Sequence, residues 1–425
     1  MGATMATILL VGSFLSPEEQ GFYYTFASVL GLQIVFELGL SLVVLQTASH
    51  EMARLHWSHR GTLEGDPIAK ARMGSLLRMA IPWYAVVAGL VLVLVLPGGH
   101  YFFAAHGRPI HDVAWQLGWA LLVVATACNL LISPLLSLIE GCGLVAEVAS
   151  MRTGQGVISS CLSWIVLACH GGLLAPAVLA GSQFCCALAW VLCRHWLLVL
   201  DLIRFGHEDV SIDWRQEVWP FQWKIAVSWI SGYFIFQLFT PVLFAYRGAV
   251  VAGQMGMSLQ AMGGVFNVSL AWLSTKAAPF GRLVAKRSYD QMDSIFFRTV
   301  AQAVSIAFLG FAVLWSGAYA LHAIHHPWSR KILDPVCLLF LVVASMVNVL
   351  VNAQAVYLRA HKEEPFMALS VLGACLCALS ALVLGRYYGA LGVCVGYASS
   401  SLIGLGFGTS IFMRKRRLWH HGVNV

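Results

Sequence analysis

The sequence predicts an all-α polytopic membrane protein of about 12 transmembrane helices, in two six-helix bundles with a central cavity. Three observations support this class. Hydrophobic residues make up 59% of the 425 residues and charged residues only 11%, whereas a soluble domain carries about 25% charge. Apolar runs long enough to cross a bilayer recur along the chain. The basic residues sort sharply between alternate loops, as expected for a membrane protein.

The apolar runs are expected to be helices, because lipid forces every backbone amide to pair within its own segment. We predict spans over residues 1–15, 21–46, 74–97, 114–139, 153–171, 174–200, 219–244, 249–275, 297–320, 335–358, 366–385 and 389–412. The first span rises only about 22 Å against a hydrocarbon core of about 30 Å. We therefore expect a missing piece of the first helix, with a basic residue, to precede Met1.

A midpoint linker and the even number of spans indicate an internal duplication. We expect one bundle over 1–200, a cytoplasmic linker over 201–218, a second bundle over 219–413 and a basic cytoplasmic tail over 414–425. Two such repeats are typical of transporters. Tryptophans in 210–224 predict an interfacial helix that leads into span seven.

The basic residues predict the topology. Of 26 Lys and Arg, all but five lie on one predicted side of the membrane. The five on the other side are Arg108, Arg247, Arg330, Lys331 and Arg386. Both termini are therefore expected in the cytoplasm, as are the long loops 47–73, 201–218 and 276–296. The net charge of +7 indicates contact with the anionic lipid bilayer and not with nucleic acid.

Glu37 is the sharpest candidate for a functional residue. It lies inside span two, in the run Phe36-Glu37-Leu38-Gly39-Leu40. A carboxylate within a membrane is costly, so its side chain should face a cavity or a partner and not acyl chains. We weigh a proton- or cation-coupling site against a structural acid that is neutral or hydrogen-bonded to a neighbouring helix.

Amide side chains recur through the spans. The candidate cavity residues besides Glu37 are Gln33, Gln46, Asn129, Gln237, Gln260, Asn267, Asn348 and Asn352. Each of these amides either bridges two helices or lines a wet cavity. As a set they suit a path for sugars, because sugars present many hydroxyls and little charge.

Basic residues near helix ends are candidates for binding a lipid phosphate. They are Arg78, Arg247, Lys276, Arg298 and Arg359. A diphosphate headgroup needs such partners, ideally bidentate arginine. The alternative is that they are ordinary anchors at the membrane surface.

Other motifs carry no cofactor chemistry. No G-x-x-x-x-G-K-[ST] motif occurs, so ATP hydrolysis is not expected. Most of the cysteines lie in apolar segments, which indicates core packing. The cluster His322, His325 and His326 has no Cys, Asp or Glu at ligand spacing, so we expect a solvated loop and no metal site. Small residues at every fourth position from Gly392 to Gly408 predict close helix packing.

The run from Leu15 through Ser16-Pro17-Glu18-Glu19-Gln20-Gly21 to Phe36-Glu37-Leu38-Gly39-Leu40 resembles the start of bacterial polysaccharide flippases. These O-antigen-type flippases belong to the multidrug/oligosaccharidyl-lipid/polysaccharide superfamily. The six-plus-six layout and the run Leu138-Ile139-Glu140-Gly141 extend the resemblance over essentially the whole chain. It implies a transporter of the inner membrane that moves polyprenyl-diphosphate-linked glycans by alternating access, for lipopolysaccharide or other cell-surface polysaccharide biosynthesis.

Two other functions stay open. A cation-coupled multidrug antiporter of the same superfamily would have a cavity dominated by acids and aromatics instead of amides and basic groups. An integral membrane glycan polymerase or ligase would need catalytic groups on a sizeable outward loop. Only Asp112 and Asp334 supply acid there, so we expect a transporter and not an enzyme. A glycan polymerase of the same pathway is an expected partner.

Overall fold

The computed structural model describes residues 2–58, 61–107, 113–205, 212–286, 288–361 and 366–420. Arg108, Asp112 and the last five residues of the predicted tail lie outside the described residues. The chain forms two compact units: unit 1 contains Met1–Ser28 and Ser231–Val425, and unit 2 contains Val29–Ile230. These units are defined by packing, whereas the predicted bundles are defined by the order of the spans along the chain. The bounds of the two bundles therefore stay a prediction.

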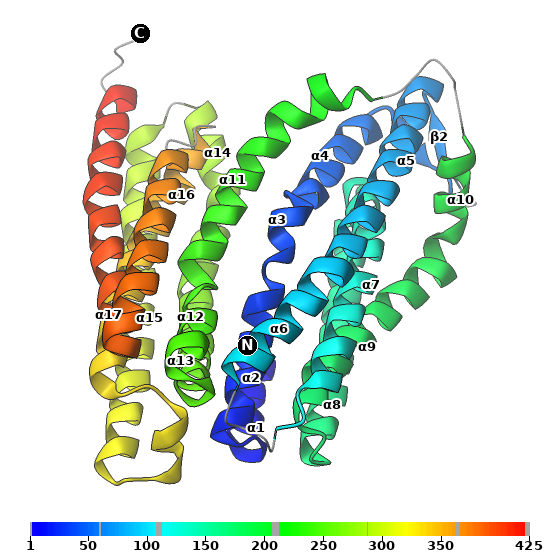
Figure 1. Ribbon diagram of the computed structural model, residues 1–425. Helices are drawn as coiled ribbons and strands as arrows, with labels where there is room; N and C mark the ends of the chain where they lie inside the picture. The colour runs from blue at the N-terminus through cyan, green and yellow to red at the C-terminus, as the bar shows by residue number, and fades with distance from the viewer. Residues whose placement is uncertain are drawn as a thin grey trace. The chain divides into compact units, whose positions relative to one another are not determined.

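Unit 2 is built mainly from helices, with one small hairpin (Figure 1). Its elements are α3 (Gln33–Glu37), α4 (Leu40–Met52), β1 (Leu55–Trp57), β2 (Leu63–Gly65), α5 (Pro67–Leu90), η1 (Val91–Val95), α6 (Leu96–His106), α7 (Gln116–Gly141), α8 (Val145–Ala168), η2 (Gly172–Leu174), α9 (Ala175–Trp190), η3 (Val191–His195), α10 (Trp196–Arg204) and η4 (Trp214–Val218). Two helices, α2 (Pro17–Leu30) and α11 (Trp219–Phe236), cross the boundary between the units.

Unit 1 is helical throughout its described part. It contains α1 (Gly2–Phe14), α12 (Phe239–Arg247), α13 (Ala249–Ser274), α14 (Ala277–Ala285), α15 (Tyr289–Ala323), η5 (Pro327–Lys331), α16 (Pro335–Ala360) and α17 (Met367–His420).

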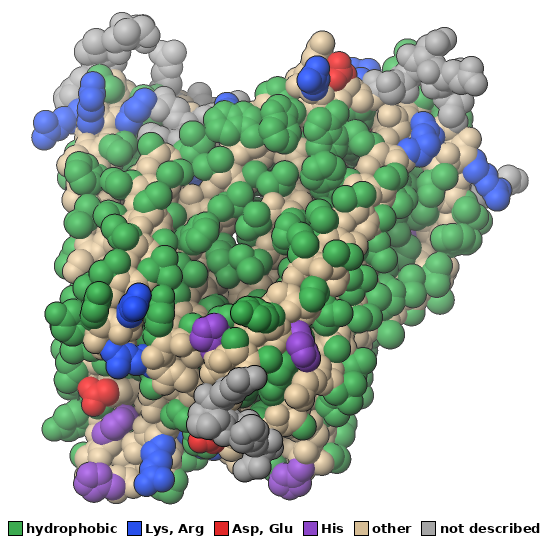
Figure 2. Space-filling model, viewed as in Figure 1, with side chains coloured by type: hydrophobic (Ala, Val, Ile, Leu, Met, Phe, Trp, Pro, Cys, Tyr) green, Lys and Arg blue, Asp and Glu red, His purple; other side chains and the backbone are tan. Residues whose placement is uncertain are grey.

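Several helices meet the physical requirements of membrane spans. Seven stretches of the described chain are long and apolar enough to cross a bilayer, and the bent pair Pro17–Glu37 and Leu40–Met52 adds an eighth if it forms one span. Hydrophobic side chains cover most of the helical surface in view, and Lys and Arg collect near helix ends (Figure 2). The predicted class, an all-α polytopic membrane protein, is confirmed.

Some predicted elements are wrong in detail. The expected continuous helix over 21–46 is broken. The one expected over 219–244 forms a single candidate span, Gln222–Arg247, with an interruption near Gln237 between α11 and α12. The loop expected over 276–296 contains the short helix α14, whose Phe280 is fully buried. Hydropathy averaged over about 20 residues does not detect a helix that is only half apolar.

The loop expected over 47–73 contains the antiparallel hairpin β1–β2. Leu55 pairs with Gly65 and Trp57 with Leu63, and both leucines are buried. Asp66 then caps the N-terminus of α5 by accepting a hydrogen bond from the Ile68 amide (2.9 Å). A hairpin of three-residue strands is too short to leave a clear alternating pattern in the sequence.

α17 contains two helices joined at Gly389, whose φ of 64° is unfavourable for residues with a side chain. The two predicted spans 366–385 and 389–412 are therefore separate helices. They fold against each other, because a Cβ at Gly392 would lie 2.2 Å from the Leu384 carbonyl oxygen and one at Gly396 2.6 Å from Ser380. The predicted packing role of the small residues is confirmed at these two positions.

α1 and the first part of α2 are fastened to α13 and η5 within unit 1. The ammonium of Lys331 donates to the Gly12 and Leu15 carbonyl oxygens, both at 2.7 Å, at the end of α1 where carbonyls lack helical partners. Gln20 donates to the carbonyls of Gly253 and Lys331. A Cβ at Gly21 would lie 2.0 Å from the Ala249 carbonyl oxygen, so only glycine permits this approach.

Candidate functional site

A break in the second predicted span presents Glu37. The chain leaves α2 at Leu30, forms the five-residue α3 and then enters α4. The segment Pro17–Glu37 is bent by 48° relative to the segment Leu40–Met52. Leu38 and Gly39 both have positive φ, 53° and 68°. A broken helix exposes backbone groups inside a membrane, which is tolerated where protein or a cavity satisfies them. Broken helices line the binding sites of many transporters.

Gly39 is required at this break for two reasons. Its φ of 68° is in the left-handed region, which residues with a side chain rarely adopt. A Cβ would also lie 2.4 Å from Cγ2 of Ile225 on α11. The backbone of the break therefore lies directly against α11.

The carboxyl of Glu37 is part of a small polar cluster within unit 2. The hydroxyl of Tyr84, on α5, donates to Glu37 Oε1 at 2.8 Å. The side chains of Ser41 on α4 and Ser133 on α7 also hydrogen-bond with that tyrosine. Tyr84 is fully buried. No described Lys or Arg forms a salt bridge with Glu37, so a hydrogen bond from a neutral group supports its carboxyl.

Gln33 begins α3, one turn before Glu37. Its Oε1 is buried and has no hydrogen-bond partner among the described residues. An unpaired buried acceptor costs free energy unless a ligand or water completes it. Glu37 therefore has a phenol as its partner, and one turn before it the helix carries an amide oxygen without a partner among the described residues. Oxygen groups of this kind suit a proton or a small cation.

The other predicted amides divide into three groups. Asn129 and Asn348 bridge helices: Asn129 donates to the Ala180 carbonyl of α9 (2.8 Å), and Asn348 donates to the Tyr397 hydroxyl of α17 (3.0 Å). Gln260 also bridges helices, because it accepts from the Tyr24 hydroxyl of α2 (2.8 Å), whereas Asn352 donates back to its own helix. The remaining three are exposed: Gln46, Gln237 and Asn267.

The five basic candidates for phosphate binding differ in their partners and in their exposure. Arg78 donates to the carbonyls of Ile203 (3.2 Å) and Phe205 (3.1 Å), and so caps the end of α10. Arg247 donates to the carbonyls of Arg386 and Tyr387. Arg298 and Arg359 are exposed, and Lys276 is half-buried at the start of α14. Arg78 belongs to unit 2 and the other four residues belong to unit 1.

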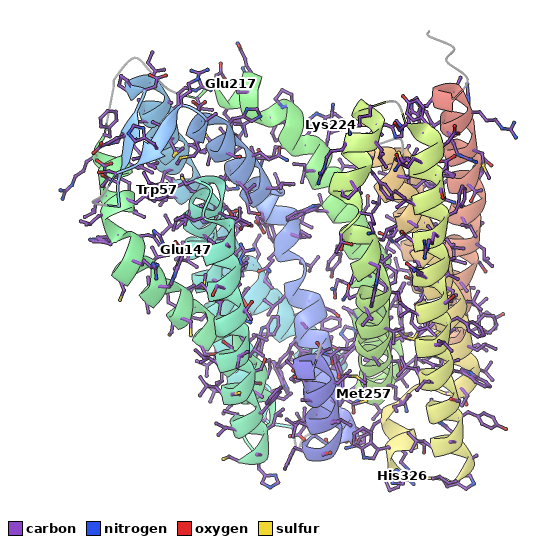
Figure 3. All side chains as sticks on the ribbon, turned by 180° about the vertical axis from the view of Figure 1, so that it is seen from behind. Trp57, Glu147, Glu217, Lys224, Met257 and His326 are labelled. Atoms are coloured by element: carbon purple, nitrogen blue, oxygen red, sulfur yellow. The ribbon has the colours of Figure 1, made fainter. Side chains whose placement is uncertain are left out.

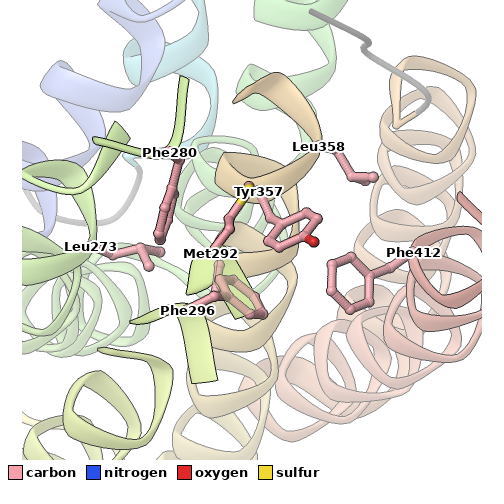
Figure 4. Packing of buried hydrophobic residues seen from close by; sticks show 8 residues of the cluster. Leu273, Phe280, Met292, Phe296, Tyr357, Leu358 and Phe412 are labelled. Carbon is pink, nitrogen blue, oxygen red and sulfur yellow. The ribbon is translucent and has the colours of Figure 1, made fainter. Parts of the chain in front are cut away.

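A second acidic cluster, absent from the sequence-based candidates, lies in unit 1. Asp293 on α15 is only 8% exposed. Arg416 of α17 approaches one of its oxygens with Nε (2.8 Å) and Nη2 (2.5 Å), and the Tyr357 hydroxyl donates to the other (2.7 Å). Phe280, Phe296 and Phe412 pack around Tyr357 (Figure 4).

Ion pairs also join the segments at one end of unit 2. Arg72 on α5 forms salt bridges with Glu51 on α4 and with Glu217 in η4, just before α11. Lys70 pairs with Asp201 on α10 at 2.7 Å. The Arg72 guanidinium lowers the pKa of Glu217 below its usual range. Figure 3 labels Glu217 in the segment that leads into α11.

Sequence reasoning missed Tyr84, Asp293, Tyr357 and Arg416. A signal existed for the acid, because Asp293 lies directly before the predicted span 297–320, but the same sequence predicts a cytoplasmic loop over 276–296. Tyrosine gave no signal, since it is common in apolar helices and is polar only at its tip. No group of three His, Cys, Asp or Glu side chains in the described ranges could hold a metal ion.

The fold is similar to that of solved transporters. No family model and no curated protein sequence matches the chain. A multidrug resistance transporter of the MATE family of the MOP superfamily, solved inward-facing, matches with a TM-score of 0.70 and 11% identity over 99% of this chain and 96% of its own. The chain has a MATE-like transporter fold.

Two further structures agree with that fold. A MOP superfamily transporter from Pyrococcus furiosus matches with a TM-score of 0.58 and 13% identity, over 98% of this chain and 92% of its own. An outward-facing MATE family transporter matches with a TM-score of 0.51 and 13% identity over the same shares.

Proposed function

We propose that the chain is an ion-coupled transporter in which Glu37 exchanges a proton or cation during alternating access. The observation that carries the proposal is Glu37 at a helix break, with a tyrosine hydroxyl and no salt-bridge partner among the described residues. A carboxyl supported by a neutral donor changes its charge without leaving an orphaned basic group. The likeness of the fold to MATE family transporters supports transport.

The proposed substrate is a polyprenyl-diphosphate-linked oligosaccharide, moved across the bacterial inner membrane for cell-surface polysaccharide biosynthesis. The resemblance of the opening motif, from Leu15 to Leu40, to polysaccharide flippases supports this substrate. The lipid tail would stay in the bilayer while the glycan crosses. A glycan polymerase of the same pathway is a proposed partner, and both termini are proposed to lie in the cytoplasm.

One observation favours a second candidate, a cation-coupled multidrug antiporter. Asn129 and Asn348 bridge helices, and Arg78 and Arg247 cap helix ends, so four candidates for a sugar-phosphate path already have protein partners. Glu37 with Tyr84 is an acid beside an aromatic side chain, as a site for cationic drugs requires. An enzymatic role receives no such support, because the Asp334 carboxylate caps α16 by accepting from the Val336 amide.

The experiment that separates these functions uses the full chain in proteoliposomes. A fluorescent polyprenyl-diphosphate-linked glycan is placed in the inner leaflet, and its appearance outside is measured with a proton or sodium gradient imposed. Gradient-dependent translocation is expected. Translocation of a fluorescent organic cation, with no movement of the glycan lipid, would support the antiporter and contradict the flippase. No gradient-dependent movement of either substrate would contradict ion-coupled transport.

A further inference from the structure

An apolar groove opens on unit 1 between α1, α13 and α15. Its volume is about 290 Å³. Met5 and Leu9 of α1 line one wall, Met257 and Met262 of α13 the floor, and Val313 of α15 the other wall. Met5, Leu9 and Val313 are 56%, 57% and 69% exposed. Exposed apolar side chains of this kind are more stable against lipid hydrocarbon than against water.

The lining of the groove is almost entirely hydrocarbon, and its polar groups are the Ser258 hydroxyl and the Trp328 indole N–H. The Ser258 hydroxyl already accepts from the Leu333 amide at 3.2 Å. The part of any ligand that enters must therefore be hydrocarbon, since an unpaired polar group in this position is costly. A glycan or a polar drug is excluded as the inserted group.

The segment η5 closes one end of the groove. Trp328 and Ile332 line it, and Arg330 and Lys331 lie between them in the chain. Met257 and His326, which precedes η5, lie at the same end of unit 1 (Figure 3). Tryptophan beside basic residues is typical of the depth at which lipid headgroups lie.

The two basic residues of η5 differ in what they bind. The Lys331 ammonium is occupied by the Gly12 and Leu15 carbonyl oxygens of α1, and burial lowers its pKa. Arg330 is exposed, and its guanidinium forms no salt bridge with any described acid. Lys331 thus fixes the wall of the groove, and Arg330 is an exposed cation, with no salt bridge to a described acid, in the segment that closes the groove.

We propose that this groove binds a phospholipid with an anionic headgroup. One acyl chain would lie along α1, α13 and α15, and the headgroup phosphate would meet Arg330 at η5. The shape is held by the protein, because Lys331 anchors α1 and a Cβ at Gly12 would lie 2.8 Å from the Trp328 ring.

The test is native mass spectrometry of the full chain with phosphatidylglycerol and, separately, phosphatidylcholine. Wild-type protein is expected to bind one phosphatidylglycerol about tenfold more tightly than phosphatidylcholine, the value of one charge-assisted hydrogen bond. Arg330→Ala is expected to remove that preference. Arg386→Ala, which alters another exposed arginine predicted on the outward side, is the control and should keep it.

A groove-filling variant tests the acyl-chain part. Gly317 lines the groove, and a Cβ there meets nothing within 4 Å, so Gly317→Phe fills the space without a backbone clash. Gly404→Phe on α17 starts from equally open space and is the matched control. Gly317→Phe should lose the tightly bound lipid. Equal lipid binding by Gly317→Phe and wild type, or equal losses in Arg330→Ala and Arg386→Ala, would overturn the proposal.

A second measurement is insensitive to small losses of stability. Phosphatidylglycerol with brominated acyl chains quenches tryptophan fluorescence on contact, and the difference between wild type and Trp328→Phe isolates the signal of Trp328. Quenching of that signal is expected in wild type and in Gly404→Phe, but not in Gly317→Phe. If brominated lipid does not quench the Trp328 signal in wild type, no acyl chain lies in the groove.

Discussion

Glu37 and Asp293 are both carboxylates in a membrane-spanning chain, but their surroundings differ in kind. Asp293 meets Arg416 through two nitrogens, with Tyr357 on its other oxygen. Glu37 meets a tyrosine hydroxyl, at a break in its helix. Each acid accepts a hydrogen bond from a tyrosine hydroxyl. The two sites therefore differ in that only Asp293 is also paired with an arginine among the described residues.

The arginine decides what each acid can do. Protonation of Asp293 would leave Arg416 without its counterion, and breaking a buried ion pair is strongly unfavourable. Protonation of Glu37 would leave only neutral groups, which adapt by turning a hydroxyl. Asp293 is therefore suited to hold α15, α16 and α17 together, and Glu37 to exchange an ion.

The largest expected effect separates the two acids by transport. Glu37→Gln should abolish gradient-dependent transport in proteoliposomes while keeping the wild-type unfolding temperature, because the amide keeps the hydrogen bond from Tyr84 but does not ionise. Tyr84→Phe keeps the carboxyl and should retain part of the activity. Wild-type transport by Glu37→Gln would reduce Glu37 to a structural acid and remove the contrast.

Asp293→Asn should lower the stability of the protein, which Glu37→Gln should leave unchanged. It is expected to lower the free energy of unfolding by about 3 kcal/mol, since it leaves Arg416 unpaired in a mostly buried position. Tyr357→Phe, which removes one hydrogen bond, should cost about 1 kcal/mol. Denaturant unfolding in detergent measures both. A fully stable Asp293→Asn variant that has lost transport would assign the coupling role to Asp293 instead.

The helix break can be tested with Glu37 left intact. Gly39→Ala should destabilise the protein by about 2 kcal/mol, because the positive φ and the contact with Ile225 both oppose a side chain. Transport should fall with it if the break orients Glu37. Gly89→Ala on α5, where a Cβ meets nothing within 4 Å, is the control. Normal transport and stability in Gly39→Ala would show that the break is dispensable.

The smallest effect concerns a third acid, Glu217. Arg72 lowers its pKa, so the ion pair stabilises the fold above the usual pKa of glutamate, about 4.3, and this contribution is lost as the pH falls through the lowered value. Because Glu217 is exposed, the effect should stay below about 1 kcal/mol. The protection of the η4 amides against hydrogen exchange, measured relative to the intrinsic rate at each pH, should fall in wild type as the pH drops below the usual pKa of glutamate. Glu217→Gln should show the lower protection at every pH; a pH dependence of protection equal to that of wild type would contradict the assignment.

The sequence predicted some of the site and missed its partners for physical reasons. Glu37 stood out because a charge inside an apolar run is rare. Tyr84 did not, because it belongs to another helix and its role depends on which face of α5 meets α3. Asp293 and Arg416 are 123 residues apart, and no local pattern links them. The amides were candidates for either of two roles, and at Asn129 and Asn348 the neighbouring helix decided for bridging.

Composition and periodicity alone determined that the chain is helical and crosses a membrane many times, because lipid requires apolar side chains and internally paired amides over whole segments. They also located Glu37 and the small residues of α17. Contacts between distant helices decided the rest: which acid is neutralised, which arginines cap helix ends, and where α1 attaches. A side chain acquires these roles from the group it faces across a helix interface, and that group is set by three-dimensional packing and not by neighbours in the chain.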